Sequence, residues 1–148
     1  MKKNYKTTKQ VREISSKRYY EDKKNSIPTV YWFVAKEDVS NEFIDVKKGD
    51  ILYVGSTMFF NHRIQRHIWC LNHCNDDVKV LKKQKIEHKE MYKKLSYVEF
   101  DIEKVEYENI TPCNLRIIEE KTIIEKKPYF NKRVATRKEI NWYDRWRI

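Results

Sequence analysis

The fold is decided by two short runs, TVYWFV at residues 29–34 and ILYVG at residues 51–55. Both runs are rich in β-branched and aromatic residues, a composition typical of strands. The stretch between them, residues 36–50, is polar and ends in Lys-Gly-Asp, which is a turn signal. We therefore predict that the two strands form a hairpin with a long connection.

Beyond the hairpin, the pattern of apolar residues changes period. It is helical over residues 60–74 and again over residues 113–127, where Pro128 ends the pattern. Residues 97–105 alternate between apolar and mostly acidic side chains and predict a half-buried strand. The Lys-rich segment 76–94 fits either a second helix or a mobile connection. The predicted order is strand, strand, helix, strand, helix.

The net charge and its distribution point towards a polyanionic partner. The chain has 32 Lys and Arg against 22 Asp and Glu, a net charge of +10 over 148 residues. Residues 1–26 carry +6 and residues 132–148 carry +4, whereas the segment between them is balanced. Such an excess favours nucleic acid as a partner, although a Lys-rich terminal segment also fits a simply solvated tail.

The remaining composition argues against two classes of protein. Three cysteines, Cys70, Cys74 and Cys113, are too few and odd in number for a secreted disulfide scaffold. No apolar run approaches the roughly 20 residues that a membrane-spanning helix requires. Residues 1–26 also lack the apolar stretch of a signal peptide. We expect a soluble, cytoplasmic protein with one compact core and no membrane association.

Polar residues form a row beside the apolar row of the helix predicted at residues 60–74. Arg63 and His67 lie one turn apart, and Cys70 and Cys74 continue the same row. We expect this row at the rim of the packing surface, where side chains are both held and hydrated. An Arg there suits phosphate oxygens and a His suits proton transfer, but the same pair is common on ordinary amphipathic helices.

A carboxylate stands among apolar residues on the last predicted helix. Leu115, Glu119 and Ile123 are spaced four apart along one face, whereas Glu120 shares its side with Arg116. A carboxylate in an apolar row costs free energy unless a cation or hydrogen bonds compensate it. The compensating group is either a divalent metal ion or a Lys or Arg in a buried ion pair, and the sequence leaves both open.

The two strands and the first helix resemble GIY-YIG nucleases. Thr29-Val30-Tyr31 stands where this family has its first signature tripeptide, and Tyr53-Val54-Gly55 resembles the second. Arg63 follows Tyr53 by ten positions and His67 follows Arg63 by four, a spacing similar to that of homing endonucleases and restriction enzymes of the superfamily. Only the Tyr of the first tripeptide is retained, and the long interval between the two tyrosines implies an extended hairpin.

The C-terminal part of the chain completes the resemblance. Glu119, Ile123, Pro128 and Asn131 resemble the family's terminal pattern of Glu, apolar, Pro and Asn, with Asn twelve positions after Glu. The similarity thus extends from about Thr29 to Asn131. Five weak elements in the same order and at similar spacing make the combination fairly specific.

The resemblance implies a fold, a domain division and a reaction. The fold class is α+β, with a small three-stranded antiparallel sheet flanked by helices. Residues 28–131 would form the catalytic domain, between a basic extension at 1–27 and a basic, aromatic tail at 132–148. The reaction would be hydrolysis of DNA phosphodiester bonds with one Mg²⁺ or Mn²⁺ per site, held by Glu119.

The resemblance also implies roles for the other residues of the pattern. Arg63 would neutralise charge in the transition state. Tyr31 would be the general base with His67 as its helper, and Tyr53 would orient the water or the phosphate, although the two tyrosine roles could be exchanged. Asn131 would hydrogen-bond the catalytic groups or fix the loop after the last helix.

Other cationic side chains are expected to contact DNA. They are Lys36, Arg66, Lys132, Arg133, Arg137, Lys138 and Arg145. In the tail, Trp142 and Trp146 are four apart and either dock a last helix on the core or contact DNA.

A homodimer would suit cleavage of both strands with one site per chain.

Two alternatives compete with a nuclease. One is a zinc module built from His67, Cys70 and Cys74, with His73 and Cys113 available, although structural zinc sites usually draw paired ligands from loops. The other is a DNA-binding protein that uses the same scaffold without catalysis.

Overall fold

A three-stranded antiparallel sheet forms the centre of the molecule. The computed structural model describes residue 13 and the ranges 27–75 and 86–131. The strands are β1 (Thr29–Ala35), β4 (Ile51–Thr57) and β5 (Phe100–Glu106). β1 is central, in the order β4-β1-β5, and pairs antiparallel with both neighbours. The predicted hairpin and the predicted third strand are therefore confirmed.

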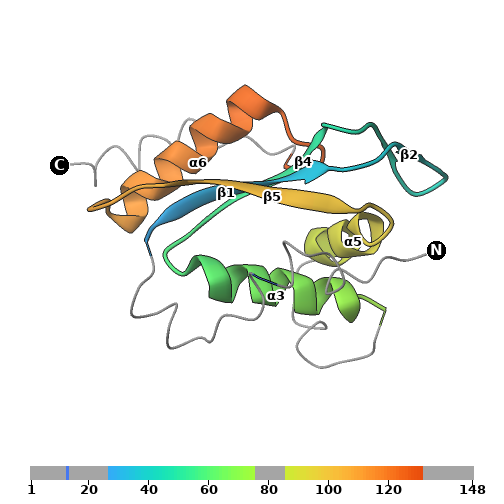
Figure 1. The fold of residues 1–148 in the computed structure, drawn as a ribbon, viewed down its shortest axis with the longest axis horizontal. Helices are drawn as coiled ribbons and strands as arrows, with labels where there is room; N and C mark the ends of the chain where they lie inside the picture. The colour runs from blue at the N-terminus through green and yellow to red at the C-terminus, as the bar shows by residue number, and fades with distance from the viewer. Residues whose placement is uncertain (1–12, 14–26, 76–85, 132–148) are drawn as a thin grey trace.

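The long connection between β1 and β4 carries its own small ribbon. β2 (Val39–Ser40) and β3 (Asp45–Val46) pair antiparallel and extend beyond the sheet (Figure 1). The return to β4 passes through Gly49, whose φ of 93° suits glycine. Asp50 then accepts a hydrogen bond from the backbone N–H of Lys47 at 2.9 Å. The turn signal seen in the sequence thus marks the end of this ribbon.

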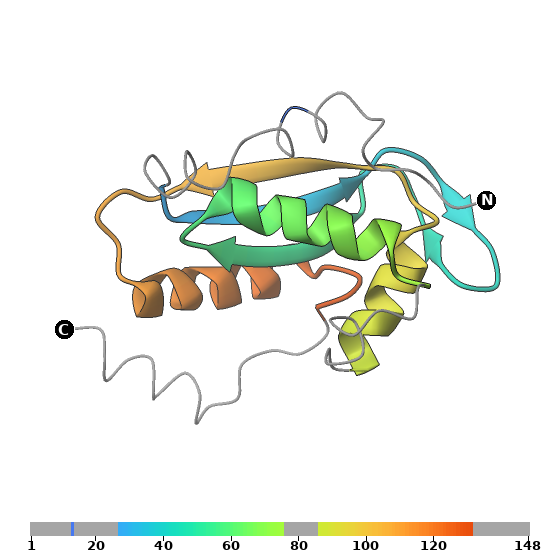
Figure 2. The ribbon, with the colours of Figure 1, turned by 90° about the horizontal axis from the view of Figure 1, so that it is seen from below.

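Helices cover both faces of the sheet. α3 (Phe60–Asn72) and α5 (Ile86–Leu95) lie below it, and α6 (Pro112–Lys126) lies above it (Figures 1 and 2). Because successive side chains of a strand point to opposite faces, Tyr31 and Phe33 join the core on the α3 side, whereas Val30 and Trp32 join a second core under α6. The predicted α+β class is confirmed.

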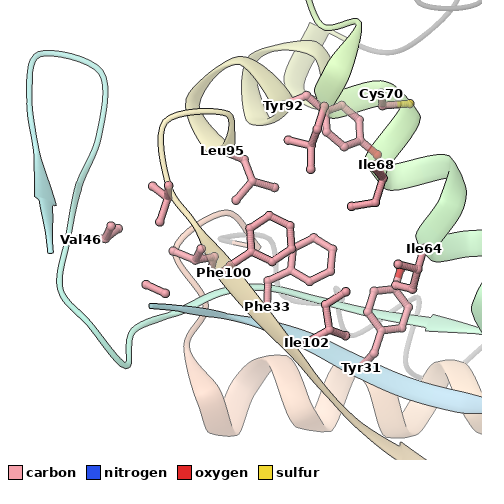
Figure 3. Close-up of a cluster of buried hydrophobic side chains, with 14 of the residues drawn as sticks. Tyr31, Phe33, Val46, Ile64, Ile68, Cys70, Tyr92, Leu95, Phe100 and Ile102 are labelled. Carbon is pink, nitrogen blue, oxygen red and sulfur yellow. The ribbon is translucent and has the colours of Figure 1, made fainter. Parts of the chain in front are cut away.

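The larger core lies between the sheet, α3 and α5 (Figure 3). Phe33 and Phe100, from neighbouring strands, stack with ring centroids 4.4 Å apart. Leu95 of α5 and Ile68 of α3 are buried against them. Residues 86–95 thus form the helix that the sequence left open, and residues 76–85 lie outside the described residues.

The last helix leads the chain back to β4. Thr111 caps α6 by accepting a hydrogen bond from the Asn114 N–H at 3.2 Å. At the other end, Lys127 is the C-cap residue, with φ of 49°, and Pro128 follows it. Tyr129 and Phe130 then donate backbone hydrogen bonds of 2.9 Å to Ile51 and Leu52. The segment after α6 is therefore held along β4, beside the second signature tripeptide.

In residues 27–75 and 86–131, no helix is both long and apolar enough to cross a membrane. The basic tail at 132–148, and the basic extension apart from residues 13 and 27, lie outside the described part of the chain.

Candidate active site

A buried chain of hydrogen bonds joins three side chains below the sheet. The Tyr31 hydroxyl lies 2.6 Å from Nε2 of His67, and Nδ1 of the same imidazole lies 2.8 Å from the Tyr92 hydroxyl. The three residues come from β1, α3 and α5, and all are buried. The structure thus brings together two predicted site residues and one that the sequence did not single out.

Tyr53 lies beside Tyr31 on the same face of the sheet. Their rings stack with centroids 6.2 Å apart and planes inclined by 6°. The edge of the His67 ring meets the Tyr53 ring at a centroid distance of 5.4 Å. Tyr31 is only 1% exposed, whereas Tyr53 is half-buried. Of the two hydroxyl-bearing side chains, Tyr53 is therefore the one with access to solvent.

Gly55 makes room for Tyr31. The two residues face each other across the β1–β4 ladder. A Cβ on Gly55 would stand 2.5 Å from the Tyr31 hydroxyl oxygen and 2.6 Å from Cζ. Contacts that short do not occur between packed atoms. The glycine of the second tripeptide is thus a steric condition for the Tyr31–His67 hydrogen bond.

The two tyrosines do not ionise readily where they lie. Burial raises the pKa of Tyr31 well above its ordinary value, Tyr53 adds to this, and the positive charge of Arg63 opposes it. Burial also raises the pKa of Tyr53, opposed by Arg63 and by Arg116. Because burial disfavours a phenolate, a proton acceptor next to the hydroxyl is needed, and His67 stands in that position.

The sequence suggested that the row of polar residues on α3 lies at the rim of the packing surface, but only part of the row is exposed. Arg63 is exposed, but His67 is 4% exposed and Cys70 is fully buried. The prediction for His67 and Cys70 was wrong because α5 packs beside α3 and covers the flank that would otherwise meet solvent (Figure 2). Arg63 lies near the start of α3, where its charge acts on both tyrosines.

Glu119 is buried, and its partner is an arginine of its own helix. Arg116 contacts Glu119 through Nη1 and Glu120 through Nη2, the latter at 3.0 Å. Glu119 is buried beside Leu115 and Ile123 of the same helix, but Glu120 is also buried, at 8% exposure, and both carboxylates contact Arg116. Of the two open explanations for Glu119, the structure shows the ion pair.

Glu119 has the character of a ligand for a hard divalent cation. Its Oε2 is buried and faces the Arg116 guanidinium, with which it forms an ion pair. Mg²⁺ and Mn²⁺ bind through one or two carboxylates, with water and phosphate oxygens completing the shell, so this oxygen fits them. The described ranges contain no group of three or more His, Cys, Asp or Glu suited to a metal ion, which leaves the zinc alternative without support there.

Asn131 fixes the backbone of the second tripeptide. Its Oδ1 accepts from the Val54 N–H at 2.8 Å and its Nδ2 donates to the Val54 carbonyl at 3.0 Å. Val54 lies between Tyr53 and Gly55, so this pair of bonds holds the strand that carries both. Of the two roles expected for Asn131, the observed contacts are those of a residue that fixes local structure.

The expected DNA-contacting residues divide into two groups. Lys36 and Arg66 are exposed, and Lys36 forms an ion pair with Asp101 at 3.8 Å. The others, Lys132, Arg133, Arg137, Lys138 and Arg145, lie outside the described residues together with Trp142 and Trp146.

Two residues of the site, Tyr92 and Arg116, were not predicted as site residues. Tyr92 lies in the Lys-rich segment whose structure was left open, and no local pattern distinguishes it from a core tyrosine. Arg116 carried a signal, because it stands three and four positions before the two glutamates.

Comparison with solved structures finds similarity to the GIY-YIG N-terminal endonuclease domain of UvrC from Thermotoga maritima. Three point mutants of that domain, bound to the catalytic divalent cation, match with TM-scores of 0.46, 0.44 and 0.43 at 15% sequence identity. Each match covers 86% of this chain and 100% of that domain. No protein-family profile and no curated protein matches the chain.

Proposed function

We propose that this protein is a GIY-YIG-type endonuclease that hydrolyses DNA phosphodiester bonds with the help of a divalent metal ion. The observation that carries the proposal is the 2.6 Å contact between Tyr31 and His67, beside Tyr53 and within reach of the Arg63 charge. Tyr31, Tyr53 and His67 lie on the α3 face of the sheet, whereas Glu119 belongs to α6, which covers the other face. A buried phenol held against an imidazole is an arrangement suited to proton transfer.

The attacking water would be activated at the tyrosine pair. Tyr53 is half-buried and Tyr31 is buried, so we assign Tyr53 to contact with the water and Tyr31 to proton transfer towards His67. This ordering keeps the roles first expected for the two tyrosines. The water oxygen would form a bond to phosphorus as the bond from phosphorus to the leaving oxygen breaks. The water proton would pass to the tyrosine–histidine chain, and the leaving oxygen would take up a proton from solvent.

Arg63 would stabilise the charge that develops on the phosphate. Its side chain is exposed, at the first turns of α3, and its charge acts on Tyr31 and Tyr53. A guanidinium offers several donors in a planar fork that matches phosphate oxygens. Donors that are in place before reaction would stabilise the transition state without reorganisation.

Glu119 would hold the metal ion. A divalent ion held by this carboxylate would supply Lewis-acid chemistry to the phosphate. Glu119 forms an ion pair with Arg116, so we infer that Arg116 would leave this contact when a metal ion binds to Glu119. Glu120, its second partner at 3.0 Å, can keep the guanidinium nearby.

The charged residues outside the site fit a DNA substrate. Arg66 lies on α3 three positions after Arg63, and the basic segments 1–26 and 132–148 carry the whole excess of positive charge. Phosphate contacts of this kind give affinity without sequence information. We assign these segments to gripping DNA around the cut, in a cytoplasmic protein that dimerises if it cuts both strands.

The test is cleavage of supercoiled plasmid by the full chain in Mg²⁺ and in chelator. Wild type should nick or linearise the plasmid only with metal. Arg63→Ala should lose cutting, whereas Arg66→Ala, on the same helix and also exposed, should weaken DNA binding and leave the chemical step intact. An inert wild type on supercoiled, linear and branched DNA would overturn the proposal.

A second candidate is a DNA-binding protein without catalysis. The ion pair between Arg116 and Glu119 favours it, because a buried carboxylate that is already compensated needs no metal. If this alternative holds, wild type and Glu119→Ala should bind DNA with equal affinity, and neither protein should cut DNA with any metal.

A further inference from the structure

Tyr92 has no role in the sequence pattern, yet it is hydrogen-bonded to His67. Its hydroxyl lies 2.8 Å from Nδ1 of His67, and its side chain is 7% exposed. It belongs to α5, outside every motif of the resemblance. Figure 3 shows Tyr92 directed from α5 towards Ile68 and Cys70 on α3. A separate helix thus supplies a partner for His67.

A neutral His67 can donate a hydrogen bond to only one of its two tyrosine partners. A neutral imidazole has one N–H and one accepting nitrogen. If Nδ1 carries the proton, it donates to Tyr92, and Nε2 is able to accept from Tyr31. If Nε2 carries the proton, it donates to Tyr31 and is unable to accept. The hydrogen bond at Nδ1 therefore decides whether His67 can take a proton from Tyr31.

Tyr92 is suited to be the acceptor at Nδ1. Burial is the main cause that raises the pKa of Tyr92 far above its ordinary value, so its hydroxyl stays neutral. The hydroxyl also hydrogen-bonds with Cys70, whose sulfur is a weak acceptor. Tyr92 can direct its own proton to that sulfur and present an oxygen lone pair to His67.

We propose that Tyr92 is a positioning residue that keeps His67 protonated on Nδ1, so that Nε2 can accept the proton of Tyr31. The consequence for catalysis rests on the proposed nuclease function. In the transfer step the O–H bond of Tyr31 breaks and an N–H bond forms at Nε2. Tyr31 becomes a phenolate, His67 becomes an imidazolium, and the proton on Nδ1 stays hydrogen-bonded to Tyr92.

The experiment combines a spectroscopic and a kinetic measurement on the full chain. Nitrogen-15 NMR of the imidazole rings reports the tautomer of His67, with its signals assigned by comparison with His67→Gln. Single-turnover nicking of plasmid is then measured across the neutral and mildly alkaline range. The variant is Tyr92→Phe, which removes only the hydroxyl. The matched control is Tyr97→Phe, because Tyr97 stacks on Phe43 at 5.0 Å and is not part of the hydrogen-bonded chain.

Wild type should show the proton of His67 on Nδ1. Tyr92→Phe should shift the population towards Nε2–H, cut about tenfold more slowly, as expected for one lost hydrogen bond, and bind DNA with unchanged affinity. Its rate should also depend differently on pH, and Tyr97→Phe should match wild type throughout.

A proton on Nε2 in wild type would overturn the proposal, as would an unchanged tautomer and rate in Tyr92→Phe. The wild-type tautomer decides the question even if Tyr92→Phe folds poorly. If wild type cuts no DNA, the nuclease function fails, while the spectra still decide whether Tyr92 sets the tautomer.

Discussion

The hydroxyl of Tyr31 occupies the space that a side chain on Gly55 would fill, with only 2.5 Å between its oxygen and the position of a Cβ. The antiparallel register places the two residues opposite each other on β1 and β4. The hydroxyl is held there by His67, at 2.6 Å. The strand pairing that builds the sheet therefore also aims the tyrosine at its histidine.

Gly55→Ala should displace the Tyr31 ring and weaken its bond to His67. We expect cutting to fall by at least about tenfold and the free energy of unfolding to fall by about 1–3 kcal/mol, as for other overpacked sites. Gly49→Ala is the matched control: Gly49 has a φ of 93° and no atom within 4 Å of its Cβ position. It should cost about 1 kcal/mol in backbone strain and leave the cutting rate of folded protein unchanged. Equal effects of the two substitutions on cutting would contradict this interpretation.

Asn131→Ala should act mainly on stability. The side chain makes two hydrogen bonds to Val54, and their loss leaves two backbone groups of β4 without that partner. We expect the free energy of unfolding, measured in urea, to fall by about 1–3 kcal/mol. Asn131→Asp should not restore it, because a carboxylate cannot donate to the Val54 carbonyl. Full stability of Asn131→Ala with complete loss of cutting would instead assign Asn131 to the chemistry.

Arg116→Gln should make the protein more dependent on metal. Without the guanidinium, Glu119 stays buried and uncompensated. Breaking a fully buried pair costs about 3–5 kcal/mol, and we expect about 1–3 kcal/mol here because the Arg116 side chain is 44% exposed. Mn²⁺ should then raise the Tm of Arg116→Gln more than that of wild type, since no cation competes for Glu119. Glu119→Gln should show no such rise, and an equal rise in all three proteins would refute a metal site at Glu119.

Stability should fall at alkaline pH because of the buried tyrosines. Burial raises the pKa of Tyr31, Tyr53 and Tyr92 above the value of about 10 in an unfolded chain. Above that pH the native state keeps protons that the unfolded state has released, so the free energy of unfolding decreases as pH rises. Below it these groups contribute no dependence. Each contributes at most about 1.4 kcal/mol per pH unit. In urea unfolding, Tyr31→Phe should show a shallower decline than wild type, and an identical decline would exclude Tyr31 as a source.

The strands and helices were predictable because their patterns are local. Alternation over residues 97–105 and helical spacing over 113–127 depend only on which face of one element is buried, and both matched within a few residues. The neighbours of a side chain are a different matter. His67 was placed at a rim because one helix considered alone has a rim, and α5 covers that flank in the folded chain.

The site was predictable only where the sequence carries a fixed interval. Tyr31, Tyr53, Arg63 and His67 were predicted from their spacing. The structure places Tyr31 in contact with His67 and Tyr53, and the charge of Arg63 acts on both tyrosines. Tyr92 was not predicted, because its contact with His67 depends on how α5 packs against α3. Such a contact between two helices produces no periodic pattern in the sequence. The partner of Glu119 was left open for a similar reason: the conformation of the long Arg116 side chain selects it.

The most direct measurement compares wild type with Glu119→Gln and Glu125→Gln on supercoiled plasmid in Mg²⁺, with DNA affinity determined in parallel. Glu125 lies exposed on the same helix, so it controls for the loss of one negative charge. Wild type and Glu125→Gln should nick or linearise the plasmid, whereas Glu119→Gln should bind it and cut at least about 100-fold more slowly. Cutting by Glu119→Gln at the wild-type rate would contradict the central claim that Glu119 holds the metal used to break the phosphodiester bond.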